Sequence, residues 1–434
     1  MKYHITTLGC RVNQYETQAM DTMLTERGHF QVPLEEAGVH IINTCAVTAE
    51  SSRKSRQAIR RAKQQNPGAI IAVCGCFSQL SPWDVLELDV DLVHGSGSRI
   101  RFVDELETLC SDRDAANYER RLRSHIDDPR ERKVFEVLPA GSVAGRTRAL
   151  LKIEDGCENF CSYCVIPIAR GTVRSIALNE AVRRAVELES EGYRELTLTG
   201  IEISSYGKDL EDTSLIDLVE AIAGAAPGLR IRLGSLEPSH VTEEFADRLA
   251  AIGSGQICDH FHLSLQSGCD EILWLMRRQY STERFAQSAE FLRRRFPNCG
   301  LTADLIVGFP GETEDQHAET LRFIERIGFS SMHIFPYSPR PGTPAADLDG
   351  RHERVVLQKR ASEAKDTASR LQNAFLERNI DETLTVLFET ETDGICTGHA
   401  GNFTRVSVEG NGLRGTLRDV KIAEVRDGLL YGNI

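Results

Sequence analysis

Three cysteines in one short loop have the spacing of iron–sulfur ligands. Cys157, Cys161 and Cys164 form the pattern C-x3-C-x2-C directly after an apolar run, residues 149–153. Thiolates spaced in this way can bind three irons of a four-iron, four-sulfur (4Fe–4S) cluster. The fourth iron is then open to a small molecule, which can bind through its amine and its carboxylate.

Zinc is the alternative ligand for these thiols. Structural zinc takes four Cys or His ligands. No fourth Cys or His occurs in the thirty residues after Cys164, and the chain has no second C-x2-C pair. The spacing therefore favours the iron–sulfur cluster over zinc or unliganded thiols.

A second group of cysteines is spread over the first eighty residues. Cys10, Cys45 and Cys76 are separated by 34 and 30 residues, which is about one strand–helix unit each. Each follows a segment that we expect to be a strand. Because the carboxyl ends of parallel strands meet at one edge of a sheet, the three thiols can converge on a second cluster there.

Two other interpretations apply to this group. Free cysteines are often small buried core residues, but these three follow their strands rather than lying inside them. Cys74 competes with Cys76, although we expect its side chain to lie within the strand. The other cysteines are isolated, and we expect core or surface thiols at Cys110, Cys258, Cys269, Cys299 and Cys396.

The elements that must position these cysteines alternate between strands and helices. Such alternation predicts a doubly wound parallel sheet for the N-terminal part and a partial β/α barrel for the centre, with chemistry at the strands' carboxyl ends. The expected N-terminal strands are residues 3–8, 39–43, 69–73 and 90–93, with helices 13–27 and 48–65. The expected central strands are residues 149–153, 195–199, 230–233, 261–265, 301–307 and 332–335.

The last part of the chain has a different pattern. A long charged helix is expected at residues 353–378, and short strands at 383–389 and 404–408 are interrupted by glycines, which is typical of a small all-β barrel. We therefore divide the chain into four parts: an N-terminal sheet domain at 1–111, a polar linker at 112–145, the central barrel at 146–370, and the C-terminal barrel at 371–434.

Composition limits the partners of this protein. The first residues lack a signal peptide, and no apolar stretch approaches eighteen residues, so we expect a cytoplasmic protein without membrane spans. The net charge of −13 argues against a generic nucleic-acid binder. One segment is locally basic, and it is either an RNA-binding face or a solvated helix surface. Its candidate RNA-binding residues are Arg53, Lys54, Arg56, Arg60 and Arg61.

The loop with three cysteines resembles the signature of the radical S-adenosylmethionine (SAM) superfamily. The resemblance implies that the open iron binds the methionine part of SAM and that reduction cleaves SAM to a 5′-deoxyadenosyl radical. Tyr163 corresponds to the usual adenine contact. Residues at the ends of other strands correspond to the remaining SAM contacts. The alternative interpretation is that each of these residues only caps its strand. These candidates are Thr199, Gly200, Ser235, Glu237 and Gln266.

Both cysteine groups together resemble the methylthiotransferase family. The resemblance implies two 4Fe–4S clusters, SAM, a tRNA substrate, an external one-electron donor and a sulfur source. It also implies a C-terminal TRAM domain, an RNA-binding barrel in which Phe403 could stack on a base and Arg405 could bind phosphate. The motifs that carry it include Ile42-Asn43-Thr44-Cys45, Gln266-Ser267-Gly268, Gly308-Phe309-Pro310-Gly311-Glu312-Thr313 and Arg340-Pro341-Gly342-Thr343-Pro344.

The segment Leu8-Gly9-Cys10-Arg11-Val12-Asn13-Gln14 is most similar to the branch that modifies carbon 2 of threonylcarbamoyl-adenosine at tRNA position 37. The alternatives within the family are isopentenyl-adenosine in tRNA and an aspartate of a ribosomal protein. A cobalamin-dependent radical SAM methylase would leave Cys10, Cys45 and Cys76 unexplained. A non-enzymatic RNA-binding protein would have no use for six ligating cysteines. No catalytic side chain is assigned from the sequence.

Overall fold

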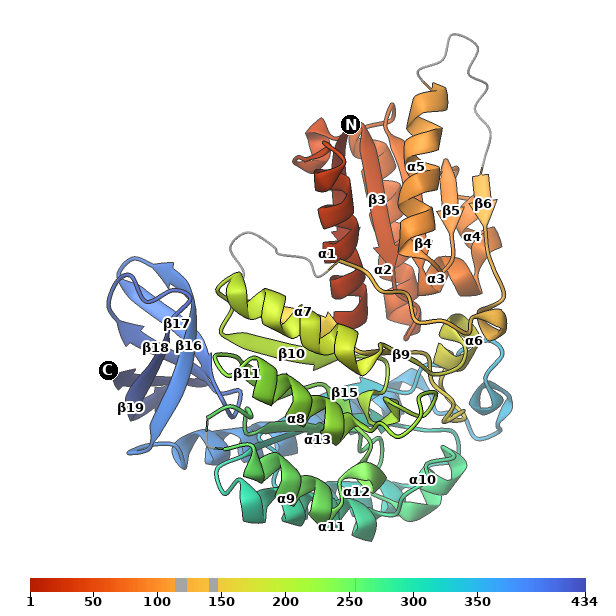
Figure 1. Ribbon diagram of the computed structural model, residues 1–434. Coiled ribbons are helices and arrows are strands. Elements are labelled where there is room, and N and C mark those ends of the chain that lie inside the picture. The colour runs from red at the N-terminus through yellow and green to blue at the C-terminus, as the bar shows by residue number, and fades with distance from the viewer. Residues whose placement is uncertain (114–122, 140–146, 254) are drawn as a thin grey trace.

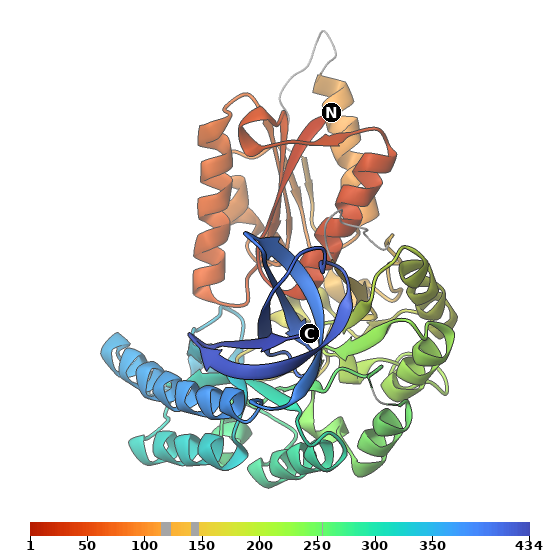
Figure 2. The ribbon, with the colours of Figure 1, turned by 90° about the vertical axis from the view of Figure 1, so that its left-hand side faces the viewer.

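The computed structural model describes residues 1–113, 123–139, 147–253 and 255–434. A parallel sheet formed by the N-terminal residues stands on a central β/α body, and a small barrel formed by the C-terminal residues lies beside that body (Figures 1 and 2). The predicted α/β fold class is confirmed. Among the described residues, every helix is too short or too polar to cross a membrane.

The N-terminal sheet has the order β2-β1-β3-β4-β5-β6, and all of its paired strands are parallel. Helices α1 and α5 pack on one face, whereas α2, α3 and α4 pack on the other, which confirms the doubly wound arrangement. The strands are β1 (Lys2–Thr7), β2 (Phe30–Gln31), β3 (Val39–Thr44), β4 (Ile70–Gly75), β5 (Leu92–His94) and β6 (Arg123–His125). The helices are α1 (Arg11–Glu26), α2 (Ala49–Gln65), α3 (Cys76–Leu80), α4 (Pro82–Leu86) and α5 (Arg99–Arg113).

Strand β6 corrects the predicted linker at 112–145. Its three residues pair with β5 and extend the N-terminal sheet. A segment this short and polar has no apolar alternation, so its sequence does not indicate a strand. Residues 114–122 and 140–146 of the predicted linker lie outside the described residues.

The central body contains all six predicted strands, in two sheets ordered β11-β10-β7 and β12-β13-β14-β15. One isolated bridge pairs Ile231 of β11 with Ile257, which lies three residues before β13 of the other sheet. The main strands are β7 (Arg148–Lys152), β10 (Glu195–Thr199), β11 (Arg230–Leu233), β13 (His260–Leu263), β14 (Gly300–Val307) and β15 (Ser331–Pro336). The two-residue strands are β8 (Glu154–Asp155), β9 (Arg174–Ser175) and β12 (Ser235–Leu236).

Side chains of these strands alternate between the outer core and the interior of the barrel. Ala149, Leu151, Leu196 and Leu198 pack outward in the largest apolar cluster of the protein. Their neighbours along the same strands, such as Arg148, therefore face the interior, which we call the lumen. The covering helices are α6 (Ile166–Arg170), α7 (Leu178–Ser190), α8 (Leu215–Ala225), α9 (Glu243–Ala251), α10 (Asp270–Leu275), α11 (Thr282–Arg295) and α12 (Glu314–Ile327).

The C-terminal residues form a long helix and then a closed barrel with the order β16-β17-β18-β20-β19. Val386, Phe388 and Val406 are among the residues that fill its core. Arg230 and Arg232 of the central body donate to its backbone carbonyls and fix it against the lumen. The elements are α13 (Arg354–Glu377), β16 (Thr383–Thr392), β17 (Ile395–Ala400), β18 (Arg405–Glu409), β19 (Leu417–Arg426) and β20 (Leu429–Asn433).

Candidate cluster sites and the barrel lumen

The loop with Cys157, Cys161 and Cys164 begins where β7 and β8 end, at the carboxyl edge of the barrel. The Cys157 amide donates to the Gly171 carbonyl at 3.1 Å, and the Cys164 amide donates to the Cys161 carbonyl at 3.0 Å. Ser162 Oγ donates to the Leu275 carbonyl at 2.7 Å. The loop is thus tied to the residues on both sides of it, which holds the three thiols together.

The electrostatics of this loop favour ligand binding. Burial raises the pKa of Cys164 to about 12, and the neighbouring Cys161 contributes to that rise. Arg278 Nη1 donates to Cys161 Sγ at 3.2 Å, and its other terminal nitrogen pairs with Glu237. Buried thiolates need a cation or a metal to compensate their charge. Arg278 is a site residue that sequence reasoning missed, because it lies far from the motif in the chain.

Cys10, Cys45 and Cys76 converge at the carboxyl edge of the N-terminal sheet. Gly9 and Gly75, which precede two of them, have φ values of +99° and +108°. A Cβ at Gly9 would lie 2.7 Å from Cys45 Sγ, and a Cβ at Gly75 would lie 2.4 Å from the Thr44 carbonyl oxygen. Only glycine allows this approach, so these glycines bring the three cysteines together.

The thiols of this second triad affect one another's charge. Burial raises the pKa of Cys45, and Cys76 raises it further. Burial also raises the pKa of Cys76; Arg170 opposes this effect, whereas Cys10 adds to it. Cys74 lies in the apolar core between the sheet, α1 and α5, whereas Cys76 begins α3 beyond the strand. The structure therefore groups Cys76, not Cys74, with Cys10 and Cys45.

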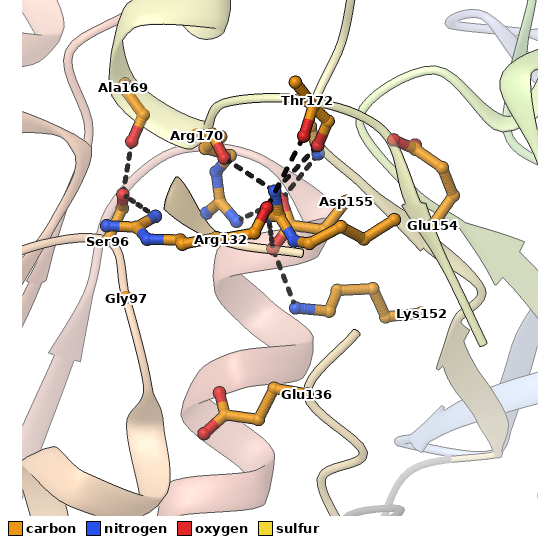
Figure 3. A network of polar contacts seen from close by, with 12 residues as sticks. Ser96, Gly97, Arg132, Glu136, Lys152, Glu154, Asp155, Ala169, Arg170 and Thr172 are labelled. Atoms are coloured by element: carbon orange, nitrogen blue, oxygen red, sulfur yellow. Dashed lines mark hydrogen bonds and ion pairs between the residues drawn. The ribbon is translucent and has the colours of Figure 1, made fainter. Parts of the chain in front are cut away.

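A buried ionic network connects the two triads. Arg170 ends α6, the helix that follows the loop of Cys157, and is fully buried. Its Nη1 lies 2.8 Å from Glu16 Oε1 and 3.0 Å from Asp155 Oδ1, and its Nη2 lies 3.0 Å from Asn13 Oδ1. Figure 3 shows Arg170 and Lys152 reaching the Asp155 carboxylate. Because Glu16 and Asn13 belong to α1, this network holds the N-terminal sheet on the barrel.

Two further residues of the central body reach the second triad. Arg340 is buried, and its Nη2 donates to Ser52 Oγ of α2 at 3.1 Å. Burial lowers the pKa of Arg340, and the nearby Cys45 opposes that effect. Ser338 Oγ accepts the Ala49 amide at 3.0 Å, at the start of α2. Residues after β15 therefore complete the surroundings of Cys45, a relation that sequence spacing does not reveal.

Both triads fit iron–sulfur clusters by their donor sets. No three Cys, His, Asp or Glu side chains of the described residues are placed to share a single metal ion. A 4Fe–4S cluster does not require that arrangement, because each thiolate binds a different iron. Three neighbouring thiols beside an arginine occur at each site, which suits a cluster whose sulfurs accept hydrogen bonds.

The SAM candidates line the carboxyl edge of the barrel around the first triad. Tyr163 is half-buried beside Arg278, and Ser235 and Gln266 are half-buried at strand ends. Gln266 has a φ of +64°, and its amide donates to the Asp304 carbonyl at 2.8 Å.

Two buried carboxyls flank this edge. Burial raises the pKa of Glu237 to about 7, and Arg278 opposes that effect. Gly200 lies beside Glu154, which sequence reasoning missed, and the carbonyl of the preceding Thr199 accepts the Ile153 amide. Burial holds the pKa of Glu154 well above its ordinary value, and its Oε1 has no partner. Such a protonated carboxyl can bind a ligand at the edge of the barrel.

The RNA-binding candidates fall into two groups. Arg53, Lys54, Arg60 and Arg61 are exposed on one helix, α2, and Arg53 pairs with Glu50 of the same helix. Arg56 is half-buried beside Asp84, and Arg405 is exposed on β18.

Phe403 requires a correction. Its ring stacks on His260 at 4.7 Å and on His399 at 4.9 Å between ring centroids, with the Arg232 guanidinium 4.9 Å from its centroid. Phe403 therefore packs the C-terminal barrel against the central one, and its ring is not a free platform for a base.

The carboxyl-edge cysteine loop on a partial β/α barrel defines the class of protein, a radical SAM enzyme. Residues 151–324 match the radical SAM superfamily, and residues 2–95 match a family described as uncharacterized protein family UPF0004. Among solved structures, the radical SAM methyltransferase TsrM from Kitasatospora setae has a similar fold, with a TM-score of 0.59 and 18% identity over 80% of this chain and 77% of that chain.

Curated relatives identify the family. Threonylcarbamoyladenosine tRNA methylthiotransferase MtaB of Bacillus subtilis is 37% identical over 96% of this chain and 92% of its own length. The enzyme of the same name from Thermotoga maritima is 34% identical over 98% of this chain and 94% of its own length. A tRNA-2-methylthio-N(6)-dimethylallyladenosine synthase of Alkaliphilus oremlandii is 34% identical over 100% of this chain and 92% of its own length. The chain belongs to the radical SAM methylthiotransferase family, and its cofactors are SAM and 4Fe–4S clusters.

Proposed function

We propose that this enzyme adds a methylthio group to carbon 2 of threonylcarbamoyl-adenosine at position 37 of tRNA. The observation that carries the proposal is the juxtaposition of the two triads: Arg170, which ends the helix after the first triad's loop, hydrogen-bonds Asn13 and Glu16 of α1, the helix that begins directly after Cys10. The relatives named for this reaction support the substrate, at 34–37% identity. Action on tRNA implies a cytoplasmic enzyme that needs an external electron donor and a sulfur source.

Each triad has its own task in this proposal. Cys157, Cys161 and Cys164 hold the SAM-binding cluster, and Cys10, Cys45 and Cys76 hold the second one, which handles sulfur. When bound, the cofactors supply a radical able to remove hydrogen from an unactivated aromatic carbon, together with the methyl group that ends on sulfur. We assign the second cluster to residues 1–111, the SAM site to 146–370 and a TRAM-like RNA-binding barrel to 371–434.

The protein's own side chains position the reactants. Arg278 connects Cys161 with Glu237, so the ligand site and a buried carboxyl keep a fixed spacing. Thr199, Gly200, Ser235 and Gln266 border the same edge and would contact SAM, with Tyr163 beside its adenine. The C-terminal barrel packs on the opposite end of the lumen through Arg148, Arg230 and Arg232.

The test is nucleoside mass spectrometry after reaction of the reconstituted enzyme. We expect methylthiolation of tRNA that carries threonylcarbamoyl-adenosine and none of tRNA that carries isopentenyl-adenosine. A Cys161→Ala variant is the negative control for both RNAs. Product on the isopentenyl substrate alone would assign the enzyme to the sister branch, and product on a ribosomal protein would assign it to the aspartate-modifying branch.

A further inference from the structure

The last strand of the central barrel, β15, carries an exposed aromatic ring on its lumen side. Met332 and Ile334 of this strand pack outward against the largest apolar cluster. Because side chains alternate along a strand, His333 and Phe335 face the lumen. Both residues are exposed, Phe335 to 41%. An aromatic ring that is left uncovered inside the barrel is available to a planar ligand.

Side chains of the two neighbouring strands share the surface on which Phe335 lies. Strand β14 pairs with β15 in parallel register, with Asp304 opposite His333 and Ile306 opposite Phe335. On β13, His262 Nε2 lies 3.4 Å from Asp304 Oδ2, and the ring centroids of His262 and His333 are 6.3 Å apart. These five residues therefore form one continuous surface, which we call the β13–β15 face.

The Asp304 carboxylate can accept further hydrogen bonds. Its side chain is 33% exposed, and His262 is its neighbour at Oδ2. In the part of the chain that the structure describes, no N–H or O–H donates to Asp304 Oδ1. His262 Nδ1 lies 3.0 Å from Thr302 Oγ1, which fixes the ring beside the carboxylate. Because a carboxylate only accepts hydrogen bonds, a ligand of this face must supply an N–H or O–H group.

The β13–β15 face lies between the two cysteine triads. On one side, Ile306 packs against the apolar cluster that includes Tyr163 of the first triad's loop. On the other side, β15 continues to Ser338, whose Oγ accepts the Ala49 amide at the start of α2, the helix that follows Cys45. A substrate that meets a radical from the first site and sulfur from the second must lie between them, and this face borders that space.

We propose that the target adenine of the RNA binds on the β13–β15 face, stacked on Phe335 and donating its exocyclic N6–H to Asp304. The inference rests on the proposed function and names the residues that position the base. Paired strands are about 4.8 Å apart and alternate residues of one strand about 6.6 Å apart, so the Cα atoms of Asp304 and Phe335 are about 8 Å apart. A purine stacked on the ring covers this distance with its exocyclic nitrogen. The ring accepts any base, whereas the carboxylate selects a base with a donor at that edge.

The experiment measures the dissociation constants of three RNA hairpins with the reconstituted enzyme. The target position carries adenine, purine without the exocyclic amine, or no base. We expect the wild type to bind adenine about 10- to 100-fold more tightly than purine, the range for a hydrogen bond to a charged group. It should bind purine about 5- to 100-fold more tightly than the abasic hairpin, the range for one base stacked on an aromatic ring.

The variants separate the two contacts. Phe335→Leu should abolish the ratio between purine and abasic hairpins, and Phe335→Tyr, which retains a ring, should keep it. Asp304→Ala should abolish only the ratio between adenine and purine, and Asp304→Asn, which retains an acceptor oxygen, should keep part of it. Phe30→Leu is the matched control, because Phe30 is an exposed phenylalanine on β2 of the N-terminal sheet.

Three results would overturn the inference. Equal binding of all three hairpins by the wild type would do so without any variant, and so would unchanged ratios in Phe335→Leu and Asp304→Ala. The adenine of SAM is the other source of the same base chemistry: if Phe335→Leu weakens SAM binding in the absence of RNA and spares the RNA ratios, the ring holds SAM instead. Iron per chain checks that the variants keep their clusters. The proposed function fails separately if the wild type does not methylthiolate tRNA with threonylcarbamoyl-adenosine, whereas turnover of that tRNA with any of these three results refutes only the base site.

Discussion

The two cysteine triads reach a similar arrangement by different routes. Cys157, Cys161 and Cys164 lie in one loop, so local backbone geometry alone keeps them together. Cys10, Cys45 and Cys76 come from three separate strand–helix units and meet only when the N-terminal sheet has formed. The first triad is thus a local motif, and the second is a product of the tertiary fold.

The second triad also depends more on its surroundings. Arg170 and Arg340 reach it from the central body, and their contacts with α1 and α2 hold that body to the sheet. The first triad receives Arg278 from its own barrel. A cluster bound between two bodies should be more sensitive to their association than a cluster bound within one loop.

The largest expected effect separates the tasks of the triads. Replacing Cys157, Cys161 and Cys164 with Ala should remove about half of the iron and abolish SAM cleavage, because the open iron belongs to that site. Cys45→Ala should still cleave SAM to 5′-deoxyadenosine under reducing conditions but form no methylthio product. Iron analysis and chromatography of the cleavage product measure both. Equal loss of cleavage in the two variants would contradict this division.

The next effect concerns the third ligand of the second triad. Cys76→Ser should lose the second cluster, since Cys76 lies beyond β4 beside Cys45. Cys74→Ser should keep near-normal iron because Cys74 faces the apolar core, although the buried hydroxyl will lower stability. Iron content and cluster absorbance of the two variants provide the comparison, and the reverse pattern would exchange the roles of the two cysteines.

A smaller effect tests the network between the bodies. Arg170→Met should destabilise the protein by about 3–5 kcal/mol, because Glu16 and Asp155 would be buried with less compensation. Urea unfolding of the metal-free chain measures this loss. Arg183→Met, which removes an exposed arginine paired with Glu180 and Glu187, is the matched control and should change little. Similar midpoints for both variants would show that the network contributes no stability.

The same network predicts a dependence on pH. Arg170 and Lys152 lower the pKa of Glu16 to about 2, although burial of this carboxyl acts in the opposite direction. A carboxyl with a lowered folded pKa stabilises the protein above its unfolded pKa of about 4.3, and this contribution is lost as pH falls toward 2. Stability of the wild type should therefore fall over that window, and the fall should be smaller in Glu16→Gln.

The smallest effects belong to the exposed basic residues. Replacing Arg53, Lys54, Arg60 and Arg61 with Ala should weaken tRNA binding modestly and reduce the log–log salt slope by about 0.7–0.9 for each phosphate that is no longer neutralised. Arg405→Ala should reduce the slope by about 0.7–0.9, as expected for a single phosphate. Filter binding at several salt concentrations measures the slope. If the slope does not change, the α2 face is a solvated surface, and RNA binding lies elsewhere.

The sequence by itself determined the local features. The spacing of Cys157, Cys161 and Cys164 predicted their loop, and apolar runs predicted the main strands, because a pattern of this kind depends only on nearby residues. Positions at strand ends predicted that Cys10, Cys45 and Cys76 meet at one edge. Strand β6 was missed because three polar residues carry no such pattern, and Phe403 was misassigned because exposure depends on the neighbouring barrel.

Only the tertiary structure decided which distant side chains complete each site. Arg278 beside Cys161, Arg170 beside Glu16, and Arg340 near Cys45 are all far from their partners along the chain. Arg230 and Arg232 appear in the sequence as two arginines among many, and only the fold shows that both pair with Glu195 and also bind carbonyls of the C-terminal barrel. Electrostatic pairing is decided by distance in space and by burial, and the order of residues along the chain specifies neither.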